Sequence, residues 1–320
     1  MSKASWAAVA ALAMVVAGSW AASQEQEGAI IAPLAAKSLL LDVAAAGDRL
    51  VAVGERGHVL VSTDGGTTWR QAPVPTRVML TAVSFCDNQV GLVAGHDAVI
   101  LRTTDGGETF RQVYSDPEAD SPLFDVACLD RTRAFAIGAY GLFLASRDGG
   151  ETWERRTIGD DDAHLHHLAR SDGGRLYIAA ERGVVLGSDN AGESWSKLRS
   201  PYEGSLFGTL PLGGAGVLLF GLRGHAFRSE DGGASWLPID TGVDAMLTGA
   251  CRLADGRIVL VGLAGVMMVS GDGGRSFALL EQRDRMGISS VIPAPDGEIV
   301  VTGEFGVRRL PVGAAAAAAR

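Results

Sequence analysis

Hydrophobic and polar positions alternate along this chain as short apolar runs that polar, glycine-rich segments separate. The first clear unit starts with an apolar run at Leu40, and two further runs cover residues 49–54 and 58–62. A polar turn and the aromatic residue Trp69 then lead into a fourth run. Apolar runs of this length between turn residues predict β-strands, so the unit predicts four antiparallel strands in about 41 residues.

This unit recurs along the chain. A pair of small residues spaced small-x-x-small marks the turn between its second and third strands, from Gly54 and Gly57 in the first unit to Gly303 and Gly306 in the last. The apolar residues that open the units are Leu40, Leu80, Leu123, Leu165, Leu206, Leu247 and Ile288. A repeat of this period is typical of a propeller blade. The sequence therefore predicts an all-β fold, a seven-bladed β-propeller of four-stranded antiparallel blades.

A turn motif of the form Ser/Thr-x-Asp-x-Gly-x-Ser/Thr-aromatic closes six of the seven units, and we call it the Asp box. A carboxylate at its third position accepts backbone N–H groups, the following glycines allow positive φ, and the aromatic residue packs between sheets. The third positions, separated by 41, 43, 42, 41 and 41 residues, are Asp64, Asp105, Asp148, Asn190, Asp231 and Asp272. Because Asn190 replaces the carboxylate within an intact motif, we interpret these residues as structural and not as calcium ligands or catalytic groups.

The seventh unit has no Asp box. Its expected strands cover residues 288–293, 299–303 and 307–310, and a fourth is missing. The apolar segment 29–32 is available to supply it, so we expect an N-terminal strand to close the ring and leave no free sheet edge. The propeller is then expected over residues 29–312, followed by an alanine-rich, disordered tail over residues 313–320.

The first 23 residues are typical of a secretory signal peptide. Lys3 is their only charge, residues 6–16 are apolar, and small residues end the segment. A retained anchor helix is the alternative, although the apolar run is short for a bilayer span. Residues 24–28 form a polar lead-in. We therefore expect an exported protein, periplasmic or secreted, without a membrane span once the signal is removed.

Composition and charge narrow the function classes. The 320 residues are 47% hydrophobic and include 43 glycines against 11 prolines, which fits a large core with many tight turns. The formal net charge is −9, and removal of Lys3 with the signal would make it −10. Such an acidic chain is a poor binder of nucleic acid or anionic lipid. No cofactor motif is present in the sequence.

The cysteines Cys86, Cys128 and Cys251 are far apart and lack the spacing of a metal site. We interpret them as three buried thiols inside strands. A disulfide between Cys86 and Cys128 is the alternative, because an oxidising compartment would permit it.

The face opposite the Asp boxes carries the candidate binding residues. The boxes join third to fourth strands, so the small-residue turns that join second to third strands lie on the other face, beside the linkers between blades. The residues just before the second small residue are diverse, which a scaffold does not require: Arg56, Asp97, Tyr140, Arg182, Arg223, Ala264 and Phe305.

Arginine and aromatic side chains dominate this variable set. Arginine has a planar fork suited to carboxylates, and aromatic residues are common anchors at interfaces. The predicted partner-binding residues are Arg56, Tyr140, Arg182, Arg223 and Phe305 in the turns, with Arg283 and Arg285 in a linker. The alternative is that these arginines are solvated turn residues.

Two histidines, His164 and His166, follow the acidic residues 160–162. On a strand they would point the same way, which is one requirement of a metal pair. No further ligands stand at recognisable spacing, so no metal site is predicted.

The repeat resembles two known families. Boxes of the type SxDGGxTW are similar to the bacterial neuraminidase repeats of sialidases, which would imply a glycoside hydrolase. The GxxGxxxxSxDGGxxW unit in seven copies, the last incomplete, resembles the photosystem II stability/assembly factor family and its bacterial relatives over residues 29–312. That resemblance implies a lumenal or periplasmic propeller that helps assemble or stabilise a membrane protein complex and uses an arginine patch.

The sialidase resemblance is weaker at the residues that would carry catalysis. An Arg-Ile-Pro segment, which usually announces the first of the three substrate-binding arginines, is absent from the sequence. No glutamate partner is recognisable for any of the four tyrosines, Tyr114, Tyr140, Tyr177 and Tyr202. We therefore predict a non-catalytic scaffold that binds a protein partner and no cofactor, with a sialidase-like hydrolase as the alternative.

Overall fold

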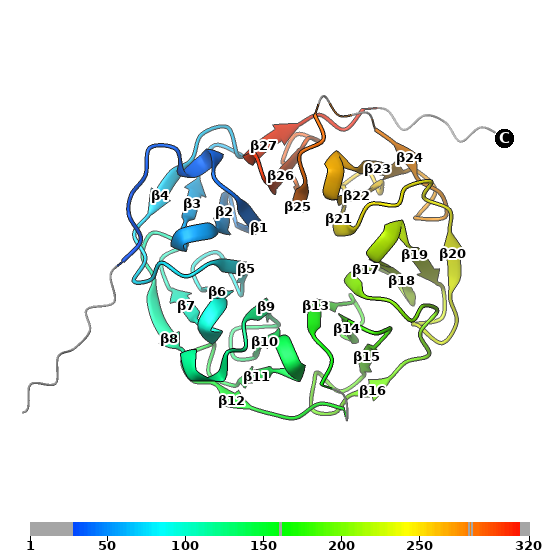
Figure 1. The fold of residues 1–320 in the computed structure, drawn as a ribbon, viewed down its shortest axis with the longest axis horizontal. Coiled ribbons are helices and arrows are strands. Elements are labelled where there is room, and N and C mark those ends of the chain that lie inside the picture. The colour runs from blue at the N-terminus through cyan, green and yellow to red at the C-terminus, as the bar shows by residue number, and fades with distance from the viewer. Residues whose placement is uncertain (1–27, 160–161, 281, 283, 314–320) are drawn as a thin grey trace, which may run out of the picture.

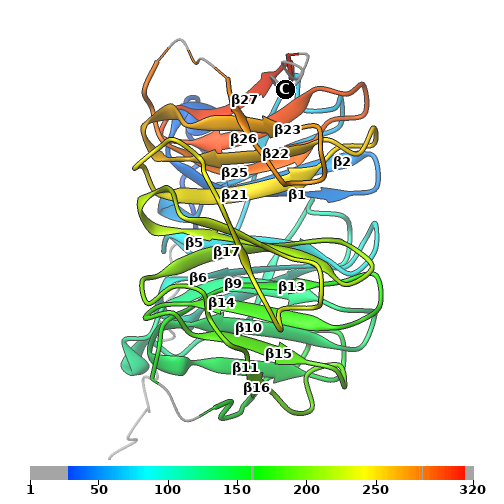
Figure 2. The same cartoon turned by 90° about the vertical axis from the view of Figure 1, so that its right-hand side faces the viewer.

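The computed structural model describes residues 28–159, 162–280, 282 and 284–313. Seven antiparallel sheets stand as blades around a central axis (Figure 1). Seen from the edge, the ring is a thick disc whose strands run across its thickness (Figure 2). The prediction of an all-β, seven-bladed propeller is confirmed.

The strands of each blade follow one another from the centre of the ring outward. Blade 1 contains β1 (Leu40–Ala46), β2 (Arg49–Gly54), β3 (Val59–Ser62) and β4 (Arg70–Ala72). Blade 2 contains β5 (Leu80–Phe85), β6 (Gly91–Gly95), β7 (Ile100–Thr103) and β8 (Arg111–Tyr114). Blade 3 contains β9 (Leu123–Cys128), β10 (Ala134–Gly138), β11 (Phe143–Ser146) and β12 (Glu154–Arg155). Blade 4 contains β13 (Leu165–Arg170), β14 (Leu176–Ala180), β15 (Val185–Ser188) and β16 (Ser196–Lys197).

The remaining blades repeat this order, and the last has three strands. Blade 5 contains β17 (Leu206–Gly213), β18 (Gly216–Gly221), β19 (Ala226–Ser229) and β20 (Leu237–Ile239). Blade 6 contains β21 (Leu247–Arg252), β22 (Ile258–Gly262), β23 (Met267–Ser270) and β24 (Ala278–Leu279). Blade 7 contains β25 (Ile288–Pro293), β26 (Ile299–Gly303) and β27 (Gly306–Leu310). Short 3-10 helices are η1 (Ala35–Lys37), η2 (Glu55–Gly57), η3 (His96–Ala98), η4 (Pro117–Ala119), η5 (Ala139–Gly141), η6 (Leu222–Gly224) and η7 (Leu263–Gly265).

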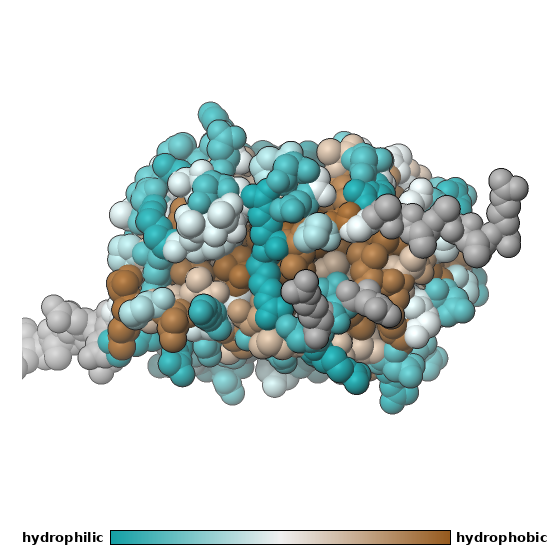
Figure 3. Space-filling view, turned by 90° about the horizontal axis from the view of Figure 1, so that it is seen from above, coloured by the Kyte–Doolittle hydropathy of each residue, from teal (hydrophilic) through white to brown (hydrophobic). Residues whose placement is uncertain are grey.

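The core lies between neighbouring blades. The second strand of a blade is apolar on both sides, and every residue of β6, β10, β14, β22 and β26 is buried. A strand of this kind needs a covered surface on each face of its sheet, and the two adjacent blades supply it. The hydrophobic clusters accordingly combine residues of two consecutive blades, such as Val51 of blade 1 with Val93 of blade 2. A space-filling view from above shows apolar side chains packed between the polar rims of the disc (Figure 3).

The Asp boxes have the predicted turn structure. In the first box, Asp64 accepts hydrogen bonds from the backbone N–H groups of Thr67 and Thr68 at 3.0 and 2.9 Å. Gly65 and Gly66 have φ values of 69° and 89°, where a side chain would be strained. These contacts hold the pKa of Asp64 down, at about 2, chiefly through the hydroxyl hydrogen bond of Thr68.

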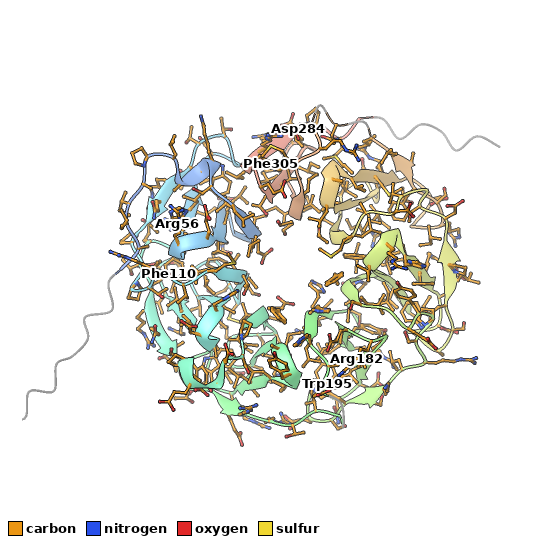
Figure 4. The ribbon with its side chains drawn as sticks, viewed as in Figure 1. Arg56, Phe110, Arg182, Trp195, Asp284 and Phe305 are labelled. Atoms are coloured by element: carbon orange, nitrogen blue, oxygen red, sulfur yellow. A yellow bond between two sulfur atoms is a disulfide. The ribbon has the colours of Figure 1, made fainter. Side chains whose placement is uncertain are left out.

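The aromatic residue that ends each Asp box packs between its own blade and the preceding one. Phe110 of blade 2 contacts the cluster shared by blades 1 and 2, and Trp195 of blade 4 contacts the cluster shared by blades 3 and 4 (Figure 4). Each box therefore fixes a turn and at the same time seals an interface between blades.

The ring closes differently from the prediction. The last blade has no fourth strand among the described residues, and residues 29–32 do not pair with β27. Instead, Ala29 donates its N–H to the carbonyl oxygen of Val74, and Ala32 donates to the side chain of Gln71, both on the outer edge of blade 1. These contacts hold the segment against the outer edge of blade 1 and not against β27, so the expected closing strand is wrong.

Closure is achieved by contacts between blades 7 and 1. Helix η1 lies against β27, and Gly306 approaches the carbonyl oxygen of Ala36 so closely that no side chain would fit. Near the centre, Ser290 of β25 donates a hydrogen bond of 2.8 Å to Asp42 of β1. On the Asp-box side, Arg309 of β27 donates to the carbonyl oxygen of Gly65 at 3.3 Å.

Cys86 and Cys128 form a disulfide, so the interpretation of three buried thiols is wrong for this pair. They are 42 residues apart, one blade period, and lie at the ends of equivalent inner strands. Ring symmetry therefore brings their Cα atoms to 5.0 Å, within the range of a disulfide. Cys251 remains a free, buried thiol, and burial raises its pKa to about 12.

The described residues contain no helix long and apolar enough to cross a membrane. The expected signal peptide over residues 1–23, most of the lead-in and all but the first residue of the expected tail lie outside the described residues.

Reduction of the disulfide is expected to destabilise the propeller by roughly 2–4 kcal/mol, because it frees a loop of about one blade in the unfolded chain. Urea denaturation of the C86S/C128S variant should show this loss, and dithiothreitol should have no further effect on it. The C251A variant serves as the control and should keep its response to dithiothreitol. Equal stability of the reduced and oxidised proteins would show that the bond is not a structural one.

The Asp boxes allow a matched pair of substitutions. In blade 4, Asn190 accepts a hydrogen bond from the N–H of Ser194 and donates one to its hydroxyl. D148N should therefore keep the turn of blade 3 and change stability little. D148A removes the acceptor of the N–H groups of Glu151 and Thr152, and should cost about 1–3 kcal/mol. Thermal unfolding of both variants measures the difference, and a loss as large in D148N as in D148A would contradict this account.

Candidate functional site

The turns between second and third strands form one face of the ring, which we call the turn face. It is the face toward the viewer in Figure 1, where η2, η3, η5, η6 and η7 encircle the centre. In six blades, the residue just before the second small residue of the turn adopts a left-handed conformation, with φ between 53° and 56°. These residues are Arg56, Asp97, Tyr140, Arg182, Arg223 and Ala264.

The backbone of these turns is fixed by its surroundings. A left-handed conformation costs a residue with a side chain about 1 kcal/mol, so the frame must impose it. A side chain at Gly57 would collide with the carbonyl oxygen of Thr76, and one at Gly183 with that of Tyr202. The second small residue thus locks the turn against the linker to the next blade, and the preceding side chain is free to vary.

The predicted arginines lie on the turn face but do not converge. Arg56, Arg182 and Phe305 occupy separate blades around the ring (Figure 4), and Arg223 lies on blade 5. The three turn arginines are exposed. The arrangement is a ring of separate side chains over a broad face, and not a pocket that holds one carboxylate between several arginines.

Two of the predicted residues have partners on this face. Arg182 forms ion pairs with Asp162 and with Glu181, the latter at 3.7 Å. Tyr140 is 61% exposed, packs edge-on against the ring of His164 at 4.8 Å and donates its backbone N–H to Nδ1 of that ring at 3.0 Å. His164 thus supports Tyr140 in the structure.

Phe305 belongs to a small cluster that sequence reasoning missed in part. The guanidinium of Arg308 lies 4.0 Å from the centre of the Phe305 ring and donates to Asp284 at 2.9 Å. The hydrogen bond from Arg308 is the main reason that the pKa of Asp284 lies below its ordinary value. Arg308 is part of β27, and the sequence pattern assigns a residue within a strand to the scaffold and not to a binding surface. Arg285 is exposed in the adjacent linker, and Arg283 lies outside the described residues.

A cavity of about 180 Å³ lies at the centre of the ring, and sequence reasoning missed it entirely. Each inner strand contains a β-bulge after its first residue. A bulge redirects a side chain, and here the seven bulged residues all line the cavity. They are Leu41, Thr81, Phe124, His166, Phe207, Thr248 and Ser289. These residues all stand at the second position of their units in the sequence. Their side chains differ so much from unit to unit that the shared position was not recognised.

Two carboxyl groups in the cavity wall bind the backbones of neighbouring blades. Asp42 accepts the N–H of Val83 in blade 2 at 2.9 Å, and Asp125 accepts the N–H of Leu168 in blade 4 at 2.7 Å. Burial raises the pKa of Asp42 to about 7 and raises the pKa of Asp125 as well. Burial also lowers the pKa of His166, so this imidazole favours its neutral form.

The described residues contain no group of three or more histidine, cysteine or acidic side chains placed to hold a metal ion. His164 supports Tyr140 on the turn face, whereas His166 lines the central cavity, so the two histidines do not act as a pair.

Sequence comparison decides the family. The model of the family described as "Photosynthesis system II assembly factor YCF48" matches residues 22–119 and 115–265, which is more than two thirds of the chain. The chain belongs to this family. The resemblance noted in the repeat is thereby confirmed.

Two curated relatives are named "Photosystem II assembly lipoprotein Ycf48". The one from Synechococcus sp. strain CC9902 is 25% identical over 146 residues, covering 44% of this chain and 43% of the relative. The one from Synechocystis sp. strain ATCC 27184 / PCC 6803 / Kazusa is 28% identical over 145 residues, covering 44% of this chain and 40% of the relative. The matched region thus spans less than half the length of these relatives. Both are named as assembly factors and not as enzymes, in agreement with the prediction of a non-enzyme.

Solved structures agree on the fold. A structure described as "YCF48 bound to D1 peptide" superposes with a TM-score of 0.72 at 19% identity, covering 90% of this chain and 97% of that one. A structure described as "YCF48 from Cyanidioschyzon merolae" gives a TM-score of 0.70 at 18% identity, covering 86% and 96%. At these identities the likeness shows the propeller fold alone.

The raised pKa of Asp42 predicts how stability depends on pH. In the unfolded chain this carboxyl ionises near its ordinary pKa of 3.8, whereas in the folded protein it ionises near 7. Between these values the folded protein retains a proton that the unfolded chain has released. The free energy of unfolding should therefore fall as pH rises from about 4 to 7, by up to about 4 kcal/mol from this group, and level off above.

The D42N variant tests this dependence. An asparagine can keep the contacts to Val83 and Ser290 without ionising. Urea denaturation between pH 4 and 8 should show a flatter profile for D42N than for the native protein. Asp125 contributes in the same direction in both proteins, so the difference between the two profiles reports chiefly on Asp42. Parallel profiles would contradict the assignment.

Proposed function

We propose that this protein is a non-catalytic assembly factor whose turn face binds a segment of a membrane protein partner. The observation that carries the proposal is the ring of exposed arginines, with the exposed Tyr140, on fixed turns in a chain that belongs to an assembly-factor family. A rigid frame with variable exposed residues is the arrangement of a recognition surface.

One solved relative, YCF48, is described as bound to a D1 peptide, which supports a protein segment as the ligand class here. A peptide with carboxylate groups would suit the exposed arginines of this face. Arg56, Arg223 and Arg285 are exposed and form no ion pair with a described residue. They can therefore bind a partner's carboxylates without first breaking an ion pair within the described part of the chain.

Aromatic residues add apolar contact area between these charges. Tyr140 is 61% exposed and is held in place by His164, so little side-chain freedom would be lost on binding. Phe305 already lies under the guanidinium of Arg308, which is itself paired with Asp284. Arg182 is held by acidic residues and has a smaller share in the proposed contact.

Export is a second part of the proposal. The signal-like residues 1–23 and the curated relatives named as lipoproteins both support a protein that acts outside the cytoplasm. We propose with it the domain order that the sequence predicts: a signal over 1–23, a lead-in over 24–28, the propeller over 29–312 and a tail over 313–320.

Charge reversal on the turn face tests the proposed surface. R56E/R223E should reduce recovery of a crosslinked membrane partner from the native envelope by about tenfold, because two exposed anchors would repel the carboxylates they bound. The control R131E/R147E reverses two exposed arginines beside the Asp boxes on the opposite face and should recover the partner normally.

The position of the crosslinks is the deciding measurement. Supporting crosslinks would join turn-face residues to an integral membrane protein. Equal recovery with both double variants would place the contact elsewhere. Hydrolysis of a sialoside by the purified protein would favour the enzyme alternative and overturn the scaffold.

A further inference from the structure

The central cavity has an unusual charge balance. Its wall contains two acidic residues, Asp42 and Asp125, and among the described residues that line it there is neither lysine nor arginine. Its two histidines are His166 and His167. An ionised carboxyl group attracts a positively charged guest, and the guest in turn favours the ionised form of the carboxyl group.

One buried polar group in the wall has no partner. Thr209 is only 2% exposed and lines the cavity, and its Oγ1 accepts or donates no hydrogen bond among the described residues. Its backbone N–H is used, because it donates to Nδ1 of His167 at 3.4 Å. A buried hydroxyl without a partner is costly, so a guest that offered it a hydrogen bond would be favoured.

An aromatic wall faces the same space. The ring of His166 lies between those of Phe124 and Phe207, with centroid distances of 5.9 and 4.6 Å. All three residues are bulged positions of inner strands. Aromatic faces attract ammonium and guanidinium groups, and most strongly where water is excluded.

The carboxyl groups retain capacity for a further donor. Asp42 accepts from Val83 and Ser290, and Asp125 accepts from Val126 and Leu168. A carboxylate has about four acceptor positions, so each group has free positions beyond these bonds. A bound cation would also offset the burial that disfavours their ionised form.

The size and position of the cavity limit the guest. A cavity of about 150 Å³ holds a ring of six carbon atoms, so 180 Å³ suits a group of roughly that size. The cavity lies at the first residues of the inner strands. These residues pair with the ends of the second strands, as Leu40 does with Gly54, so the cavity is on the turn-face side of the ring.

We propose that the central cavity binds one compact organic cation, a primary ammonium or guanidinium group on a short stem. Two sources share this chemistry: a free small amine, or a lysine or arginine side chain of a protein partner. The second source rests on the proposed function, whereas the cation site itself does not.

Titration of the purified full-length protein tests the site. Ethylammonium and ethylguanidinium are the probes, with propionate and propanol as controls of similar size. Saturable shifts of the imidazole NMR signals of His166 and His167, and a rise in the unfolding midpoint, are expected for the cations alone. D42N/D125N should weaken binding by about tenfold or more, because neither amide can ionise beside the cation.

Matched variants keep the test decisive. D148N removes one carboxylate from an Asp box and should bind the cations normally. T209V and F124L change the hydroxyl and the aromatic wall without touching either acid, so they test the site if D42N/D125N does not fold. Each should weaken binding several-fold. Binding of propionate as strong as that of ethylammonium, or cation binding unchanged in D42N/D125N and T209V, would overturn the proposal.

The source of the cation is resolved by the crosslinking assay. If a partner supplies the side chain, ethylammonium should compete with partner recovery and D42N/D125N should reduce it. If the ligand is a free amine, partner recovery should be unchanged while the cation titration remains positive. R56E/R223E should leave the titration intact, so a failed turn-face proposal and a failed cation site give different results.

Discussion

The central constraint on this structure is that each blade has two apolar faces and can bury neither by itself. The second strands are apolar on both sides, so every sheet needs a neighbour on its left and on its right. An open row of blades would leave two large apolar surfaces in water. A closed ring removes both, and the ring in turn creates a central axis and two faces.

In this ring, the residues that hold the fold together and the residues that are free to vary lie at different places. On one face the side chains of the Asp boxes form local hydrogen bonds and pack between blades. On the other face a second small residue such as Gly57 or Gly183 holds the backbone of the turn, so the preceding side chain can vary. The β-bulges of the inner strands do the same at the centre, where seven side chains line one cavity. Repetition of the backbone thus permits diversity of the side chains at two places.

Repetition also explains what could be predicted from the sequence. The blade number, the strand bounds and the Asp-box turns depend on local patterns, and strands such as β2, β25 and β26 have the bounds that the pattern predicted. The disulfide and the central cavity depend on which positions of different blades meet. Cys86 and Cys128 are one period apart, so their closeness in space can be predicted only once the ring arrangement of the blades is known. Arg308, His164 and Asp42 act through partners in other segments, which no local pattern identifies.

Closure without a shared strand couples the centre of the ring to its integrity. In this chain blades 7 and 1 meet through packing of η1 on β27 and through hydrogen bonds made by Asp42 and Arg309. Asp42 binds blade 7 through Ser290 and blade 2 through Val83, so a single carboxyl group in the cavity wall connects three blades. A guest that changes the charge of this carboxyl group also changes the strength of the closing contact. The coupling free energy is the same whichever of the two effects is measured. Binding at the centre and stability of the ring are therefore linked, and the link is reciprocal.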